Sequence, residues 1–231
     1  MAALLGERFA PITSMIGLLH APLADVVPFM KRWREGLYNR VTITPLDGAL
    51  AECLPRLEPL VSGARPRELL IEVADGWTAY FDCGARGTDA SPVVGHVTRN
   101  LPCAGVALTA VPSGPTRYGA VQFSLFSPLR TDRMNVVRTI ELIQDGKRWT
   151  FEAHGMVLPF EETSAYGQRL KRDRFTTEML ERYCRELGVD AFNADAYGPT
   201  ALLFESSVEL PPNPKIMSLS EAQRWNGIVP G

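Results

Sequence analysis

Apolar and polar residues alternate on both sides of two Asp-Gly pairs. The pairs Asp75-Gly76 and Asp145-Gly146 separate four such segments, at residues 68–74, 77–82, 136–144 and 147–153. Asp-Gly readily adopts the positive φ angles of a type I′ turn, which joins two antiparallel strands. The pattern therefore predicts two β-hairpins.

The second hairpin also predicts which side chains share a face of the sheet. A two-residue loop at Asp145-Gly146 pairs Leu142 with Trp149 and Ile140 with Phe151. The positions between these residues are mostly polar, so we expect one face of this hairpin to be buried and the other exposed.

The first hairpin carries apolar side chains on both of its faces. The same two-residue loop pairs Ile71 with Tyr80 and Leu70 with Phe81. A strand that is apolar on both faces has to be covered on both, so we expect this hairpin to lie deeper in the fold than the second one.

Helical periodicity, capping residues and further apolar runs predict the remaining elements. Helices are expected at residues 25–36, 47–61, 91–101, 176–187 and 218–225. Asp25, Ser91 and Thr176 are the expected N-caps of the first, third and fourth of these helices, and two prolines should break the second. Strands are expected at residues 12–19, 40–44, 105–111, 118–126 and 201–210. The fold class is therefore predicted as α+β, with a mainly antiparallel sheet of about six or more strands and helices packed on at least one face.

The organisation into domains follows from the lack of a long flexible linker. The length of 231 residues suits one domain, so we expect a single α+β domain over residues 1–231. The alternative is a division at the loop 62–66. Residues 1–62 would then form a separate strand–helix part, and residues 67–231 would form the hairpin-rich main domain.

Composition and charge exclude several classes of partner. A formal net charge of −2 gives no general attraction for a nucleic-acid backbone or an anionic membrane surface. The first residues lack the basic start and long apolar core of a secretory signal, and the apolar run at residues 12–19 is too short to span a bilayer. We therefore expect a cytoplasmic protein without a nucleic-acid or membrane partner.

Cysteines and histidines are the residues that would bind a metal ion or act as nucleophiles. The sequence contains Cys53, Cys83, Cys103, Cys184, His20, His96 and His154. These residues form no C-x-x-C pair and no H-E-x-x-H motif. A metal site or a Cys–His pair assembled from distant residues stays open as an alternative. The sequence predicts four free thiols and no metal site.

Nucleotide-binding and serine-hydrolase motifs are absent from the sequence. It has no Walker A motif, no G-x-G-x-x-G after a strand and no G-x-S-x-G. ATP, NAD and FAD in their commonest binding modes are therefore not expected. We predict no cofactor, and the sequence assigns no catalytic residue.

The strongest local candidate for a binding site is the loop from Asp82 to Asp89. The loop leaves a strand, contains Gly84 and Gly87, and enters a helix. Its backbone N–H groups and the helix N-terminus could therefore face an anion. Arg86 could add a bidentate donor to the same ligand.

The two aspartates of this loop support a different interpretation. They would repel an anion, and they could instead cap backbone groups of a tight turn that the glycines allow. Trp77 lies beside the turn of the first hairpin, so it is the tryptophan that we expect to be partly exposed. The candidate binding residues are Trp77, Tyr80, Asp82, Arg86 and Asp89.

Three segments give the chain a resemblance to small cytosolic bacterial proteins without an assigned activity. The segments are Gly76–Asp82 with Gly84 and Arg86–Asp89, then Arg117–Phe123, then Arg172–Thr176 with the helix that follows. The likeness covers residues 68–190, includes no diagnostic motif and gives no residue a role. Single-domain proteins of this kind are often immunity proteins, which bind and block a toxin, so the resemblance implies a protein partner.

Three functions remain as hypotheses. The first is a protein-binding role without catalysis, as a bacterial immunity protein that neutralises a toxin; the slightly acidic balance would suit a basic partner. The second is an enzyme or binding protein for a small polar or phosphorylated metabolite, with its site at the Asp82–Asp89 loop. The third is a structural subunit of a larger assembly.

Overall fold

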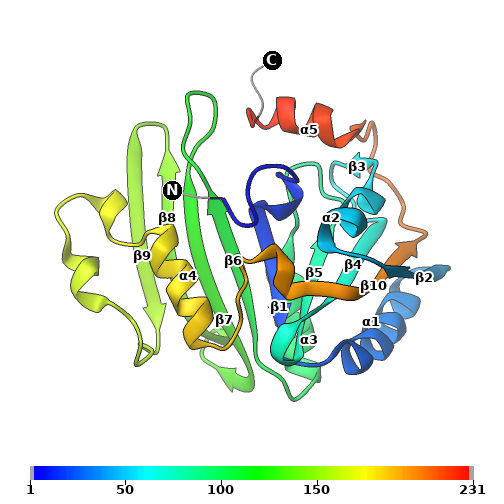
Figure 1. The fold of residues 1–231 in the computed structure, drawn as a ribbon, viewed down its shortest axis with the longest axis horizontal. Coiled ribbons are helices and arrows are strands. Elements are labelled where there is room, and N and C mark those ends of the chain that lie inside the picture. Colours follow the sequence, from blue (N-terminus) through cyan, green and yellow to red (C-terminus); the bar gives the residue numbers. More distant parts are fainter. Residues whose placement is uncertain (1–2, 229–231) are drawn as a thin grey trace.

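A nine-stranded sheet forms the centre of the computed structural model, which describes residues 3–228 (Figure 1). The strands, in chain order, are β1 (Met15–Leu19), β2 (Val41–Asp47), β4 (Arg67–Val73), β5 (Trp77–Asp82), β6 (Gly105–Val111), β7 (Ala120–Thr131), β8 (Met134–Asp145), β9 (Arg148–Gly155) and β10 (Tyr197–Ser206). Their order in the sheet is β2-β10-β4-β5-β1-β6-β7-β8-β9, and all neighbours are antiparallel. The predicted α+β fold is thus confirmed.

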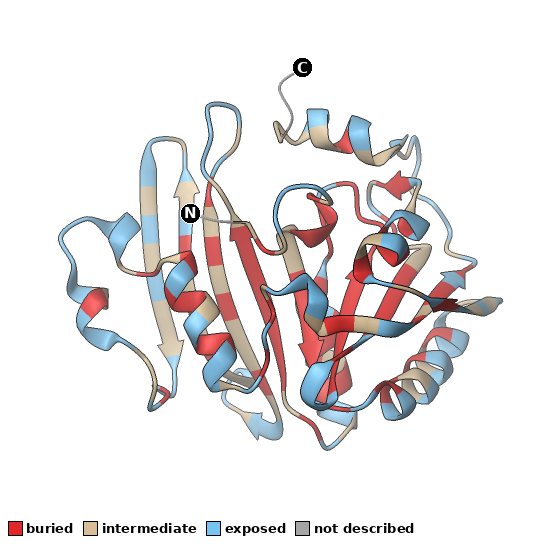
Figure 2. Cartoon of the chain, viewed as in Figure 1, coloured by how far each residue is buried: buried red, intermediate tan, exposed pale blue. Residues whose placement is uncertain are grey.

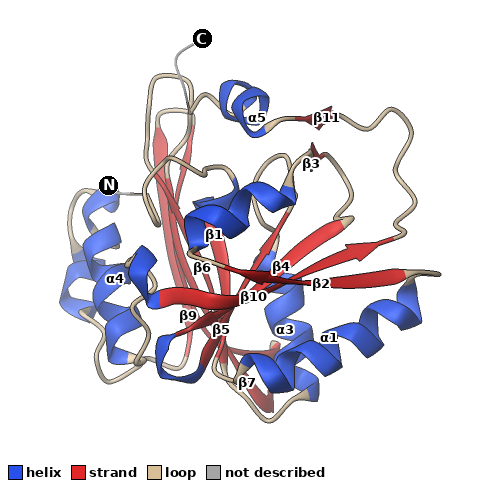
Figure 3. Cartoon of the chain, turned by 45° about the vertical axis from the view of Figure 1, so that its right-hand side comes forward, coloured by secondary structure: helices blue, strands red, loops and turns tan. Residues whose placement is uncertain are grey.

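Helices cover both faces of this sheet (Figure 3). One face packs against α1 (Leu23–Leu37) and α3 (Ala90–Asn100), and the other packs against α2 (Leu50–Cys53) and α4 (Thr177–Glu186). Short 3-10 turns are η1 (Ile12–Ser14), η2 (Leu54–Leu57), η3 (Ala74–Gly76), η4 (Thr163–Gly167), η5 (Lys171–Asp173) and η6 (Ala194–Ala196). The last helix, α5 (Leu219–Trp225), follows a two-residue pairing of β11 (Ile216–Met217) with β3 (Leu60–Val61).

Two hydrophobic cores lie on opposite faces of the sheet. Successive residues of a strand point to opposite faces, and in β5 Phe81 belongs to one core while Tyr80 belongs to the other. The central strands are consequently buried along most of their length (Figure 2). The first hairpin, β4–β5, lies in this central part of the sheet, as its two apolar faces predicted.

The first hairpin has a different register from the predicted one. Its loop contains three residues, Ala74–Gly76, and both Asp75 and Gly76 have positive φ angles, of 61° and 80°. Leu70 therefore lies opposite Tyr80, where the two-residue loop had paired Leu70 with Phe81. The predicted pairing is wrong by one residue because Ala74 belongs to the turn rather than to the strand.

The second hairpin turns one residue later than predicted. Arg148 pairs with Asp145, so the two loop residues are Gly146 and Lys147, and only Gly146 has a positive φ. A type I′ turn on Asp145-Gly146 would need positive φ at both residues. The pairing shifts by two positions, which places Leu142 opposite Phe151.

The faces of the second hairpin survive this shift, because a displacement of two residues preserves the alternation. Ile140 and Leu142 are fully buried, and Trp149 and Phe151 are partly buried against the same core. The shared apolar face is therefore confirmed, although its individual pairs were predicted wrongly.

Three helix starts can be compared with their predicted caps. Thr176 caps α4 as predicted, because its hydroxyl accepts a hydrogen bond from the Met179 N–H. Asp25 and Ser91 are not caps: α1 begins at Leu23 and α3 at Ala90, so both residues lie in a first helical turn. The predicted helix at residues 47–61 is interrupted at its prolines into α2, η2 and β3, as expected of proline in a helix.

Strands from the beginning and the end of the chain meet within the one sheet. β1 lies between β5 and β6, and β2 pairs with β10, which in turn pairs with β4. Residues on both sides of the loop 62–66 therefore contribute strands to the same sheet.

Candidate functional site

The predicted loop from Asp82 to Asp89 does connect β5 to α3, but its leading carboxylate is inside the protein. Asp82 has no exposed surface, and it accepts hydrogen bonds of 2.8 Å from the N–H groups of Gly84 and Asp89. Arg65 Nε lies 2.9 Å from Asp82 Oδ1. The negative group at the start of α3 is therefore Asp82 itself, which matches the interpretation that this aspartate caps backbone groups.

Trp77 and Tyr80, on β5, are also buried. Trp77 is 3% exposed and stacks on His20, with 4.6 Å between ring centres, so the prediction that Trp77 is partly exposed is wrong. Trp77 does follow the turn directly, but its side chain packs into the hydrophobic core on one face of the sheet and is covered by His20. The Tyr80 hydroxyl donates a hydrogen bond of 2.7 Å to Glu68 Oε1. Trp77, Tyr80 and Asp82 therefore face the interior.

Arg86 and Asp89 are the exposed members of the predicted set. The Arg86 guanidinium lies 4.8 Å from the centre of the Trp225 ring, at the end of α5. Next to it, the Asn226 side-chain amide donates a hydrogen bond of 2.8 Å to the Ala85 carbonyl. The C-terminal helix thus packs against this loop and takes up part of its polar surface.

A buried chain of charged groups runs beneath the loop. Arg34 on α1 forms a bidentate ion pair with Glu68, at 2.7 and 2.5 Å, and Glu68 accepts the Tyr80 hydroxyl. Tyr80 in turn lies 3.3 Å from Asp82 Oδ2. Burial, followed by the charges of Glu68 and Asp82, raises the pKa of Tyr80 well above its ordinary value. Tyr80 therefore stays protonated and acts as a donor within this network.

Asp82 should make the protein less stable as the pH rises from about 4 to about 6. Burial raises the pKa of Asp82 from 3.8 to about 6, although Arg65 and two N–H donors favour its charged form. The native state then holds a proton that the unfolded chain has lost, so stability falls through this window. Relative to Asp82→Ala, which cannot titrate, the wild type should lose about 2 kcal/mol of unfolding free energy between pH 4 and pH 7, as measured by urea denaturation. A stability difference that is the same at both pH values would contradict this assignment.

The cysteines and histidines do not form a reactive pair in the structure. All four cysteines are buried and free. Cys103, His20 and Asp25 line one hollow of about 570 Å³, yet burial raises the pKa of the Cys103 thiol to about 11, with no cation lowering it. A thiol of this pKa stays protonated near neutral pH, so it is not an activated nucleophile.

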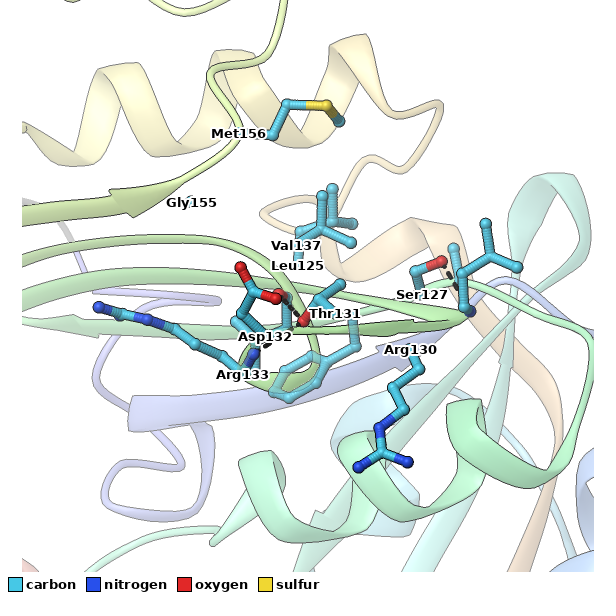
Figure 4. Close-up of a pocket in the computed structure, with 13 residues that line it drawn as sticks. Leu125, Ser127, Arg130, Thr131, Asp132, Arg133, Val137, Gly155 and Met156 are labelled. Carbon is cyan, nitrogen blue, oxygen red and sulfur yellow. Dashed lines mark hydrogen bonds between the residues drawn. The ribbon is translucent and has the colours of Figure 1, made fainter.

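A larger hollow lies elsewhere, at the tip of the β7–β8 hairpin (Figure 4). Its volume is about 860 Å³, which falls in the range of binding pockets. Most of its lining is apolar and comes from both strands of the hairpin, from Ala104 and from the end of β9: Leu125, Phe126, Leu129, Val136, Val137 and Met156. Ser127, Arg130, Thr131, Asp132 and Arg133 form its polar part.

Large apolar side chains are exposed at this hollow, which Leu129 and Met156 line, and beside it, where Met134 begins β8 and Val157 follows Met156 in the chain. They are Leu129 (73% exposed), Met134 (64%), Met156 (63%) and Val157 (54%). Single exposed apolar residues are ordinary, whereas a group of them around a hollow marks an interaction surface. We call these four residues, with Arg99, Arg130, Asp132 and Arg133, the tip surface.

A bulge in β7 gives the tip its shape. Phe126 pairs with Val136 and Thr131 pairs with Met134, so four residues of β7 stand opposite one residue of β8. That one residue, Asn135, is buried, and its amide donates to the carbonyls of Ser127 (3.1 Å) and Gly95 (3.2 Å) and to the Thr98 hydroxyl (2.8 Å). Asn135 therefore fixes the bulge against α3 and holds the tip surface in place.

Sequence reasoning missed this surface because the hairpin was not recognised. The expected strand ended at Phe126 and the next began at Val136, which left residues 127–135 without an assignment. The available signal was the run Pro128-Leu-Arg-Thr-Asp-Arg-Met134, in which Leu129 and Met134 interrupt an otherwise polar turn. Two separate apolar residues in a polar segment are a weak signal, because single exposed apolar residues are ordinary and only the fold brings these two together with Met156.

Other signs of function are limited. Within residues 3–228, no group of three or more His, Cys, Asp or Glu side chains is arranged to hold a metal ion. No helix over the same residues has the length and apolar character needed to cross a membrane. The chain matches no protein-family model, no curated protein and no solved structure.

Proposed function

We propose that the protein is a non-catalytic binding protein that recognises another protein through the tip surface. The observation that carries this proposal is the exposure of Leu129 and Met156, which line a hollow of about 860 Å³, together with that of the adjoining Met134 and Val157. All four side chains are more than half exposed. Burying such side chains against a partner would release ordered water, which is the main favourable contribution to association.

The shape of the surface also supports binding of a preformed partner. Asn135 ties the bulge to α3 through three hydrogen bonds, so the exposed side chains start from a fixed backbone. A surface that is already ordered loses less conformational entropy when it binds. By contrast, Asp82 of the predicted metabolite loop and Tyr80, two residues before it on β5, form their hydrogen bonds inside the protein.

Affinity purification with a tip variant tests this proposal. Leu129→Glu combined with Met156→Glu should remove binding to a partner that the wild-type protein retains, with at least a 30-fold rise in Kd of the purified pair, about 2 kcal/mol. The matched control is Leu37→Glu, which changes a residue of similar exposure (55%) on α1. Both sites are on the surface, so fold stability should change little in either variant.

Two outcomes would contradict the proposal. A partner that binds the tip variant and the wild type equally would place the interface elsewhere, and a protein that retains no specific partner would remove the binding role. The immunity role is the specific form of this proposal. It requires that the identified partner be toxic when expressed alone and harmless together with the wild type, with the protection lost in the tip variant.

A further inference from the structure

The tip of the β7–β8 hairpin separates two hollows of different character. The hollow on one side, of about 860 Å³, has a mostly apolar lining. The second hollow, of about 500 Å³, has a more polar lining, made by Arg99, Pro128, Arg130, Thr131, Asp132, Met134 and Asn135. Arg130, Thr131 and Asp132 line both hollows, so these residues form the ridge between them.

Positive charge predominates at this ridge. The ridge and its surroundings carry three arginines, Arg99, Arg130 and Arg133, and one carboxylate, Asp132. The whole chain, in contrast, has a formal net charge of −2. In the described part of the chain, no ion pair joins any of these four groups to another residue. Three guanidinium groups are therefore available to an anionic partner.

The geometry directs two of these arginines toward the polar hollow. Arg99 is held by a 3.0 Å hydrogen bond from its Nε to the Gly95 carbonyl, and Arg130 lines the same hollow. Figure 4 shows the Arg130 side chain pointing away from the ridge in the direction opposite to Asp132. Asp132 is thus not placed to neutralise Arg130.

We infer that the tip surface recognises a protein segment in which a bulky apolar side chain lies close to a carboxylate. The apolar side chain enters the larger hollow beside Val137 and Met156, and the carboxylate crosses the ridge to Arg99 and Arg130. This inference rests on the proposed function and adds the chemistry of the partner. It reverses the expectation of a basic partner, because the charge at the binding surface differs in sign from the charge of the chain.

A concave surface favours a protein segment over a membrane. Cationic and apolar side chains together also suit an anionic lipid surface. A side chain that inserts into lipid stands out from a convex loop, however, whereas here Leu125 and Val137 line a hollow that a protruding side chain can fill. Asp132, which lines both hollows, would additionally be repelled by anionic headgroups.

Selection from a phage-displayed library of random peptides tests the inference with the intact chain. We expect enriched peptides to combine large apolar residues with Asp or Glu. Binding of a synthetic enriched peptide, followed by fluorescence anisotropy, should weaken roughly tenfold or more in Arg99→Gln/Arg130→Gln, as for the loss of a charged hydrogen bond. The matched control is Arg32→Gln/Arg169→Gln, which removes two exposed arginines outside the tip and should bind as the wild type does.

The failures of the inference and of the proposed function are distinguishable. Peptides that depend on Leu129 and Met156 but carry no carboxylate, or that bind Arg99→Gln/Arg130→Gln unchanged, would overturn the inference and leave the proposed function. A selection that yields no peptide dependent on Leu129 and Met156 would overturn both. Co-sedimentation with phosphatidylcholine–phosphatidylserine vesicles, lost in the same arginine variant, would assign the surface to a membrane and also overturn the inference.

Discussion

Replacing Arg34 by methionine should reduce the free energy of unfolding by about 3–5 kcal/mol, as is typical when one partner of a buried ion pair is removed. Both charged groups are buried, and the guanidinium binds both oxygens of Glu68 at 2.7 and 2.5 Å. Without Arg34, the Glu68 carboxylate would be left in the interior with the Tyr80 hydroxyl as its one side-chain donor among residues 3–228. Urea denaturation at neutral pH measures the loss.

A surface pair provides the matched control for this effect. Arg182 and Glu162 form an ion pair of 2.6 Å in which both side chains are nearly half exposed. Arg182→Met should therefore change stability by less than about 1 kcal/mol. Equal effects of Arg34→Met and Arg182→Met would show that burial of the Arg34–Glu68 pair does not determine its contribution.

Replacing Tyr183 by alanine should cost a similar amount, about 3–5 kcal/mol, because it removes a large side chain from the core. Tyr183 on α4 is fully buried, and its ring lies 5.4–6.2 Å from three other rings, those of Phe123, Phe160 and Phe175. It therefore joins α4 to β7 and to the segments before and after η4. The loss would appear as an earlier midpoint in urea denaturation.

The conservative change Tyr183→Phe separates packing from hydrogen bonding. The Tyr183 hydroxyl accepts a hydrogen bond of 2.7 Å from the Glu162 N–H and lies 3.2 Å from the Tyr166 hydroxyl. Tyr183→Phe keeps the ring and should cost only about 1–2 kcal/mol. If phenylalanine were as destabilising as alanine, the hydroxyl rather than the ring cluster would carry the stability.

The fold was predictable from sequence where the local signals were strong. The two Asp-Gly pairs located β4–β5 and β8–β9, and the Thr176 cap located α4. Register was not predictable at the same level. Whether Asp145 belongs to the turn or to the strand depends on the backbone angles of a single residue, and the sequence Asp-Gly permits both answers.

The candidate site was less predictable than the fold. Asp82 was correctly suspected of capping backbone groups, but nothing in the sequence shows that Arg65, from the loop before β4, would pair with it. The tip surface depends on a bulge, on Asn135 and on Arg99 from α3, which are distant in sequence. Contacts of this kind follow from the three-dimensional arrangement of the strands and not from any local pattern.

The position of β10 between β2 and β4 has a consequence for the order in which the chain can fold during synthesis. In the sheet, β2 has β10 as its only neighbour, and about 160 residues separate the end of β2 from the end of β10. At roughly 5–20 residues per second, a ribosome needs about 8–30 s to make that stretch. During this time the hydrogen-bonding groups of β2 and one edge of β4 have no native partner in the nascent chain. This side of the sheet is thus the part for which a chaperone has the longest opportunity to act.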